Sequence, residues 1–90
     1  MTNIKHKDIP LSILARKDSY FVMSNGKFSD NQTTIETENS EIVKISATVE
    51  DNPKLPAFLR GLGSSIEVLE PSSLRLYFKE LARELLTKYQ

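Results

Sequence analysis

Apolar positions recur at every second residue in the first half of the chain, which is the period of a β-strand. Residues 9–15 alternate apolar and polar side chains and predict a strand with one better-buried face. Residues 41–50 alternate in the same way, and residues 33–38 before them form a second β-rich run. Because the connection between these two runs is short and polar, they predict an antiparallel hairpin, with Asn39 as the residue best suited to a positive φ.

The segment between the first strand and this hairpin predicts one short helix and one loop. Residues 16–23 carry large apolar side chains, and Asp18 or Ser19 is placed to open a helix there. Residues 24–32 concentrate Asn, Gly, Ser and Asp, which favour turns through left-handed backbone angles and local hydrogen bonds.

The last third of the chain changes to helical spacing. Asp51, Asn52 and Pro53 form a helix start, because an Asp or Asn side chain accepts from free N–H groups and Pro presets φ. Gly61 and Gly63 can both adopt the left-handed conformation that ends a helix. The apolar face between these signals consists of Leu55, Phe58, Leu59 and Leu62.

A short strand and a long helix follow. Residues 66–70 are too few for a stable helix between Gly63 and Pro71, and they predict a strand. Ser72 or Ser73 is expected to cap the last helix. The main apolar stripe of that helix is Leu74, Phe78, Leu81, Ala82, Leu85 and Tyr89.

The predicted order is strand, helix, strand, strand, helix, strand, helix. Two βαβ-like halves of this kind indicate an α+β domain with the ferredoxin-like split β-α-β arrangement. This is a four-stranded antiparallel sheet with helices on one face, here with an extra C-terminal helix. We expect one domain over residues 9–90, preceded by a disordered tail or linker at residues 1–8.

Composition narrows the function classes. A chain of 90 residues has room for one modest core. Its 12 basic and 12 acidic residues give a formal charge of zero, which argues against tight DNA binding by this domain unaided. The absence of cysteine excludes disulfides and thiolate metal sites. No apolar run is long enough for a membrane span or a signal sequence, so we expect a soluble, cytoplasmic protein without a membrane partner.

Residues able to carry chemistry are few, and structural roles account for them. His6 is the single imidazole and has no second ligand near it in the sequence. Glu50 and Asp51 stand where a strand turns into a helix, and capping accounts for Asp51. Residues 61–65, GLGSS, follow a helix instead of opening one, so these glycines indicate a helix stop and not a phosphate loop. We therefore expect no enzyme activity, no cofactor and no metal.

The last helix carries a basic row whose members are four residues apart. This row indicates either a ridge for phosphate or an acidic partner, or a solvated face. On the second interpretation, Glu80 pairs with Arg83 and Glu84 pairs with Lys88. Charge reversal along the row separates the two interpretations. The row consists of Arg75, Lys79 and Arg83.

Apolar side chains on the same helix extend beyond one stripe. Either the helix is sandwiched between the sheet and another element, or part of it is exposed and able to bind a partner. The alternative to an interface is that these side chains pack in the core of the domain. The candidate interface residues are Leu76, Tyr77, Phe78, Leu86 and Tyr89.

The order of residues in the last third is specific in its arrangement. Phe58-Leu59 lies in a helix that ends at Leu62-Gly63, followed by the strand Ile66-Glu67-Val68-Leu69, then Glu70-Pro71, then Leu74-Arg75 at the start of the long helix. This pattern resembles the C-terminal extension, or WCX domain, of the WYL-domain transcription regulators. Upstream, Gln32, the strand from Val43 to Val49 and the strand from Ile9 to Ala15 extend the resemblance over most of the chain.

The resemblance implies a noncatalytic regulatory and dimerisation domain. In that family a winged helix-turn-helix binds DNA, a WYL domain senses a nucleic-acid or nucleotide effector, and the extension helps the regulator to dimerise. The implied partners are a second copy of the chain and the WYL and helix-turn-helix domains of a parent chain, with DNA contacted through the latter. The resemblance sets Arg60 and Arg75 beside the effector groove. Together with the basic row, the candidate effector or phosphate contacts are Arg60, Arg75, Lys79 and Arg83.

A second interpretation stays open at this point. The same pattern of elements is compatible with a stand-alone ferredoxin-like domain that binds a small molecule or another protein. A parent sequence that contains helix-turn-helix and WYL segments would distinguish the regulator from the stand-alone domain.

Overall fold

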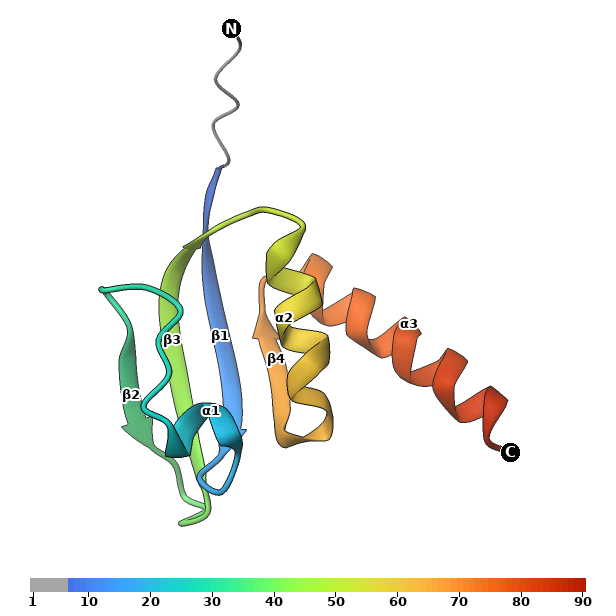
Figure 1. Ribbon diagram of the computed structural model, residues 1–90, viewed down its shortest axis with the longest axis horizontal. Coiled ribbons are helices and arrows are strands. Elements are labelled where there is room, and N and C mark those ends of the chain that lie inside the picture. Colours follow the sequence, from blue (N-terminus) through green and yellow to red (C-terminus); the bar gives the residue numbers. More distant parts are fainter. Residues whose placement is uncertain (1–6) are drawn as a thin grey trace, which may run out of the picture.

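The computed structural model of the chain describes residues 7–90, and the expected tail falls largely on residues 1–6, outside this range, as does His6. Four strands and three α-helices make up the described part (Figure 1). In chain order they are β1 (Asp8–Arg16), α1 (Tyr20–Met23), β2 (Thr33–Glu36), β3 (Ile42–Glu50), α2 (Lys54–Leu62), a 3-10 turn (Gly63–Ser65), β4 (Ile66–Glu70) and α3 (Ser72–Lys88).

The strands form one antiparallel sheet in the order β2-β3-β1-β4. Its centre is β1, in which Ile13 lies opposite Ile45 of β3 on one side and opposite Val68 of β4 on the other. β2 and β4 are therefore the two edge strands. The predicted α+β class with a four-stranded antiparallel sheet is confirmed.

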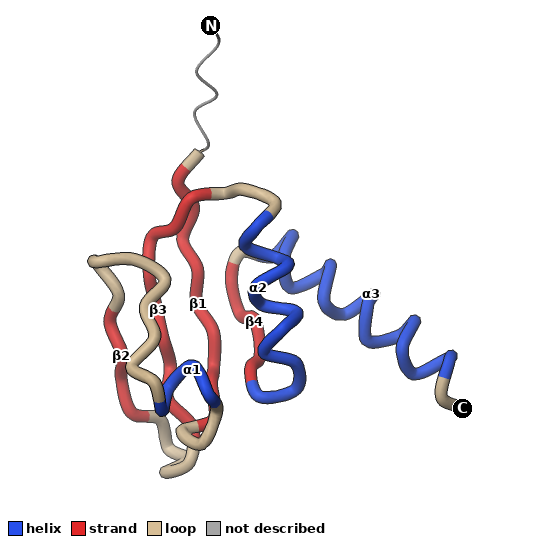
Figure 2. Tube along the Cα trace, viewed as in Figure 1, coloured by secondary structure: helices blue, strands red, loops and turns tan. Residues whose placement is uncertain are grey.

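One face of the sheet carries the core. Because side chains alternate between the two faces of a strand, the buried apolar residues of β1 and β3 all point the same way, whereas Leu14 and Ile42 lie on the other face. α1 and α2 lie over this face (Figure 2), and Leu59 of α2 is fully buried there with Leu11 and Ile13 of β1. The buried cluster consists of Leu11, Ile13, Ala15, Val43, Ile45, Ala47, Val49, Leu59, Val68 and Leu74.

The cap predicted at the start of α1 is observed, and the caps predicted at the start of α2 are observed in part. Ser19 precedes α1, and its Oγ accepts a hydrogen bond from the Val22 N–H at 3.4 Å. At α2 the acceptor is the side chain of Asn52, which lies 2.8 Å from the Lys54 nitrogen. The capping role expected for Asp51 is wrong, because α2 begins at Lys54, after Pro53. Within the described residues Asp51 makes no side-chain hydrogen bond; its N–H donates to the carbonyl of Lys7.

Two further sequence expectations about helix ends need correction. α3 has no side-chain cap from Ser72 or Ser73, because Pro71 occupies the capping position and its carbonyl accepts from the Arg75 N–H at 3.0 Å. At the end of α2, Gly63 has the expected positive φ of 58°, whereas Gly61 stays inside the helix. The helix stop therefore depends on one glycine.

The positive φ expected at Asn39 occurs instead at Asn25, where φ is 56°. Asn39 closes the hairpin in another way: its side-chain oxygen accepts from the Glu41 N–H at 2.9 Å, and its carbonyl accepts from the Ile42 N–H at 3.0 Å. The hairpin thus turns through local hydrogen bonds rather than through a left-handed residue.

The loop before β2 folds around three aromatic rings. Phe21, Phe28 and Phe58 meet edge to face, with ring centroids 4.4 Å apart for the first pair and 5.9 Å apart for each of the others. Gln32 holds the loop closed, because its side chain accepts from the Phe28 N–H at 2.8 Å and donates to the Gly26 carbonyl at 3.1 Å. The loop therefore joins α1 to α2 through packing.

Gly26 is the position in this loop where a side chain does not fit. A Cβ atom there would lie 2.6 Å from two ring carbons of Phe21 and 2.9 Å from the Phe21 carbonyl oxygen. We predict that Gly26→Ala lowers the free energy of unfolding by about 1–3 kcal/mol, because the buried Phe21 ring has to move.

Gly61→Ala is the matched control. Nothing lies within 4 Å of a Cβ at Gly61, which is helical, so this change raises the free energy of unfolding by roughly 0.5–1 kcal/mol. Urea denaturation followed by circular dichroism measures both values. Equal effects of the two substitutions would contradict the packing described for Phe21.

Candidate functional site

α3 begins in the core and then leaves it. Leu74 is buried and Phe78 packs at the edge of the core, but every residue from Ala82 to the end of the chain is exposed. Figure 1 shows the helix diverging from α2 and β4 toward the C-terminus. Of the two arrangements the sequence allowed for the last helix, the partly exposed one is observed.

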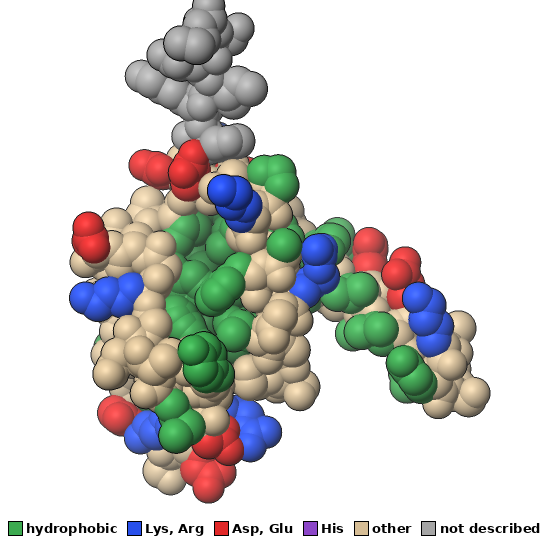
Figure 3. Space-filling model, viewed as in Figure 1, with side chains coloured by type: hydrophobic (Ala, Val, Ile, Leu, Met, Phe, Trp, Pro, Cys, Tyr) green, Lys and Arg blue, Asp and Glu red, His purple; other side chains and the backbone are tan. Residues whose placement is uncertain are grey.

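The exposed end of α3 carries a single apolar face, which we call the α3 end face. Its members follow the spacing i, i+3, i+4 and i+7, so they lie on one side of the helix. Leu85 is 46% exposed, Leu86 61% and Tyr89 85%, which is unusual for residues of this size. Figure 3 shows hydrophobic side chains gathered along one side of α3. The α3 end face consists of Ala82, Leu85, Leu86 and Tyr89.

The structure separates the five candidate interface residues. Leu86 and Tyr89 belong to the α3 end face, whereas Leu76, 53% exposed, lies on the opposite side of the helix by its spacing. Phe78 is partly buried and packs against the core, and Tyr77 packs its ring against Phe78 with centroids 5.2 Å apart. The sequence interpretation missed Leu85 as an exposed residue, since its stripe position equally fits the core.

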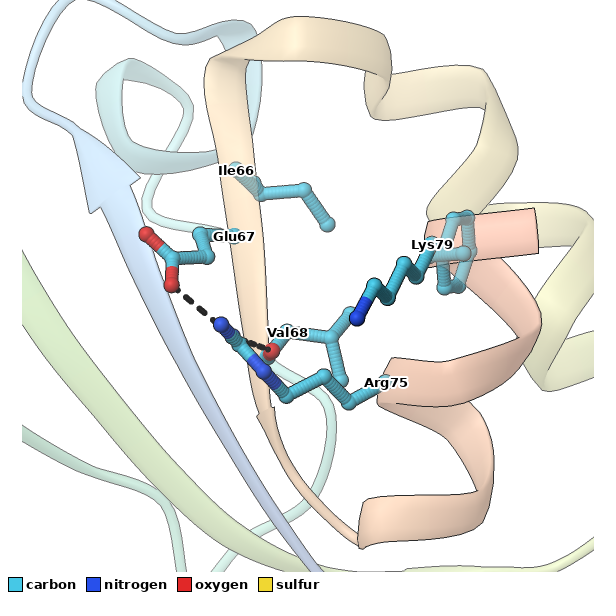
Figure 4. Close-up of a pocket in the computed structure, with 6 residues that line it drawn as sticks. Ile66, Glu67, Val68, Arg75 and Lys79 are labelled. Atoms are coloured by element: carbon cyan, nitrogen blue, oxygen red, sulfur yellow. Dashed lines mark hydrogen bonds and ion pairs between the residues drawn. The ribbon is translucent and has the colours of Figure 1, made fainter. Parts of the chain in front are cut away.

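A groove lies between the edge strand β4 and α3. It has a volume of about 410 Å³ and an apolar floor, with charged groups from both elements around it (Figure 4). Arg75 of α3 reaches back to β4, where one guanidinium nitrogen donates to a Glu67 carboxylate oxygen and to the Val68 carbonyl, both at 2.8 Å. The lining residues are Ile66, Glu67, Val68, Arg75, Phe78 and Lys79.

Lys79 is the available charge in this groove. Figure 4 shows its side chain extending from α3 toward Val68 and Arg75. Within residues 7–90 no carboxylate forms an ion pair with Lys79, whereas the charge of Arg75 is paired with Glu67. The groove therefore holds two cations against one carboxylate and carries a net positive charge.

The four candidate effector contacts do not form one cluster. Arg75 and Lys79 line the same groove, but Arg60 lies on α2, where its guanidinium donates to the Tyr77 hydroxyl and so links α2 to α3. Arg83 is exposed on α3, and it is not among the residues that line the groove. Across the described range, neither Glu80–Arg83 nor Glu84–Lys88 forms an ion pair, so the weak pairs expected from the sequence are not made.

A second charged site lies at the far end of β1. Arg16 donates to the Asp18 carboxylate at 2.6 and 2.9 Å, and this hydrogen bond holds the pKa of Asp18 below its ordinary value and raises the pKa of Arg16. Lys17 pairs with Glu36 of β2 at 2.8 Å. These exposed pairs tie the end of β1 to its neighbours and contribute little to stability.

The described part of the chain shows no cluster of metal ligands. Residues 7–90 contain no group of three or more His, Asp or Glu side chains able to hold a metal ion. Ser64 and Ser65, the serines of the GLGSS segment, sit in the 3-10 turn after α2. None of the described helices has the length and apolar character needed to cross a bilayer.

Comparison with known families gives one match. The model of the family described as the WCX domain matches residues 16–86, which is more than half of the chain. The match covers every element from the end of β1 through most of α3, including the β4–α3 groove. No curated protein matches the chain significantly.

Proposed function

The chain belongs to the WCX-domain family, and from that premise we propose that it acts as the noncatalytic regulatory and dimerisation domain at the C-terminus of a WYL-type transcription regulator. The observation that carries the dimerisation proposal is the α3 end face. Three large apolar residues on one side of a diverging helix form a surface of the kind that protein partners cover.

The wider setting follows from the family. We propose that the partners are a second copy of this chain and the WYL and helix-turn-helix domains of a parent regulator, in the cytoplasm. DNA is then contacted through the helix-turn-helix domain, which is consistent with the zero formal charge of this chain. We also propose the ferredoxin-like arrangement for its fold, which the alternation of helices and antiparallel strands supports.

The β4–α3 groove is the second part of the proposal. We propose that it borders the effector site, with Lys79 as the contact for an anionic group such as a phosphate. Its ammonium, which forms no ion pair within residues 7–90, and the apolar floor supplied by Ile66, Val68 and Phe78 support this assignment. Arg75 acts as a positioning residue, because its guanidinium is already bound to Glu67 and to the backbone of β4.

One test of the proposal concerns self-association. Leu86→Glu places a charge in the α3 end face and is expected to weaken dimerisation at least about tenfold, a loss of roughly 1.4 kcal/mol. Sedimentation equilibrium over a range of micromolar concentrations measures the dissociation constant for the wild type and the variant.

Thr87→Glu is the control for this experiment. Thr87 is the next residue along α3 and is also exposed, but its spacing places it on the side of the helix away from the α3 end face. It introduces the same charge at the same helix end and is expected to leave the dissociation constant unchanged. A wild type that is monomeric at every concentration would refute the dimerisation proposal.

Another test concerns the β4–α3 groove. We expect a short single-stranded oligonucleotide to shift the amide resonances of residues 66–79 in NMR spectra. Lys79→Glu should weaken that binding at least about fivefold, because a charge at contact distance contributes about 1 kcal/mol in water. Inorganic phosphate, titrated separately, shows whether a phosphate group alone is sufficient for these shifts.

Lys44→Glu provides the matched control, since Lys44 lies on β3 and does not line the groove. It changes the net charge of the protein by the same amount as Lys79→Glu. If both variants lose the same affinity, the binding is a general charge effect and the groove assignment is wrong.

A further inference from the structure

An asparagine followed by a glycine ends α1, and the fold favours each of these residue types at its position. Asn25 has a left-handed backbone with a φ of 56°, a conformation that asparagine adopts more readily than most residues other than glycine. Gly26 lies against Phe21, so closely that a Cβ atom there would be 2.6 Å from two ring carbons. Local geometry therefore places an exposed asparagine directly before a residue without a side chain.

This pair of residues is chemically reactive in a flexible chain, because glycine has no Cβ to hinder approach of its backbone nitrogen. A bond forms between the Gly26 nitrogen and Cγ of Asn25, the Cγ–Nδ2 bond breaks, and ammonia leaves with the proton of the Gly26 N–H. Water then opens the resulting cyclic imide at one of its two carbonyls. The product is aspartate or isoaspartate in place of Asn25.

The C-terminal cap of α1 keeps the two reacting groups apart. The Asn25 N–H donates to the Val22 carbonyl at 3.1 Å and the Gly26 N–H donates to the Phe21 carbonyl at 2.8 Å, which are the two hydrogen bonds of a Schellman motif. The attacking nitrogen is thus already bound. A left-handed residue also has a ψ of about +47°, which turns the next nitrogen away from its own Cβ and hence from the side-chain amide.

Gln32 holds the other side of the same glycine. Its Nε2 donates to the Gly26 carbonyl at 3.1 Å, while its Oε1 accepts from the Phe28 N–H at 2.8 Å. The backbone N–H and the carbonyl of Gly26 are therefore both hydrogen-bonded. The Gly26 nitrogen can reach the Asn25 side chain only after these contacts have opened.

We propose that Asn25 is a deamidation site whose rate is set by local opening of the α1 cap. With the cap closed the residue stays asparagine, and with the cap open it converts. Exposed loop segments open locally at a lower free-energy cost than the whole domain, so conversion does not require global unfolding. Isoaspartate adds one carbon to the backbone, so the Schellman motif cannot form again in that product. An opening that is reversible in the intact chain becomes permanent in the modified one.

Peptide mass spectrometry after incubation at mildly alkaline pH measures the rate, with chromatography to separate isoaspartate from aspartate. We expect Asn25 to convert at least about tenfold more slowly in the folded protein than in the chain unfolded by urea. Gln32→Ala should raise the rate in the folded protein at least about fivefold, because two hydrogen bonds of the closed loop are lost, and should leave the rate in urea unchanged. Asn52 is the internal control, since Pro53 has no N–H with which to form the imide.

Val49→Ala is the control for global stability, because Val49 is a core residue of β3 opposite Ile9, at the end of β1 away from α1. It weakens the whole domain and is expected to leave the conversion of Asn25 in the folded protein unchanged. Equal acceleration by Val49→Ala and Gln32→Ala would overturn the inference, since conversion would then proceed through global unfolding.

Equal rates in the folded and the urea-unfolded wild type would overturn it as well, and so would an Asn25 that stays intact in urea. Gln32→Glu takes the place of Gln32→Ala if circular dichroism shows that the alanine variant is unfolded. It keeps the acceptor for the Phe28 N–H and removes the donor to the Gly26 carbonyl.

Discussion

The last helix is longer than the sheet edge against which it packs, and this mismatch governs the rest of the structure. β4 has five residues and advances about 17 Å, whereas α3 has 17 residues and advances about 25 Å. The helix diverges from the strand as well. The apolar stripe of α3 packs against the core at Leu74 and Phe78 and then continues, exposed, through Leu86 and Tyr89. A small domain thus presents an apolar helix face without giving up its own core.

Specific contacts fix the direction in which α3 leaves. Arg75 binds both the side chain of Glu67 and the backbone of Val68, so the first turn of the helix is tied to the edge strand. Arg60 and Tyr77 connect α2 to the next turn. Because these contacts lie at the inner end of α3, they orient the helix and leave its outer end free to bind. The same contacts occupy Arg75 and leave Lys79 as the available cation of the β4–α3 groove.

The sequence predicted most of this framework because its signals are local. Period-two alternation located β1 and β3, the short polar connection located the hairpin, and Gly63 and Pro71 bracketed β4. Helix starts were predicted less well. At α2 the side chain of Asn52 accepts the hydrogen bond instead of that of Asp51, and at α3 Pro71 stands in the capping position where a serine was expected. Several adjacent residues could cap each helix, and the packing of the folded protein decides at which of them the helix begins. The predicted regulatory role came from the resemblance to the WCX domain, and the family match confirms that the chain belongs to the WCX-domain family.

The interaction surfaces were harder to predict, for a physical reason. The spacing of a helical stripe does not say where the body of the protein ends, so Leu85 appeared as a core position although it lies beyond the core. The cluster of three phenylalanine rings has no sequence signature, because Phe28 and Phe58 are distant in the chain and meet through tertiary packing. Whether a partner covers the end of α3 is tested most directly by amide hydrogen exchange of residues 82–89 at several protein concentrations. Our account predicts that protection of these amides rises with concentration while that of β1 and β3 stays constant. Protection that is independent of concentration would contradict it.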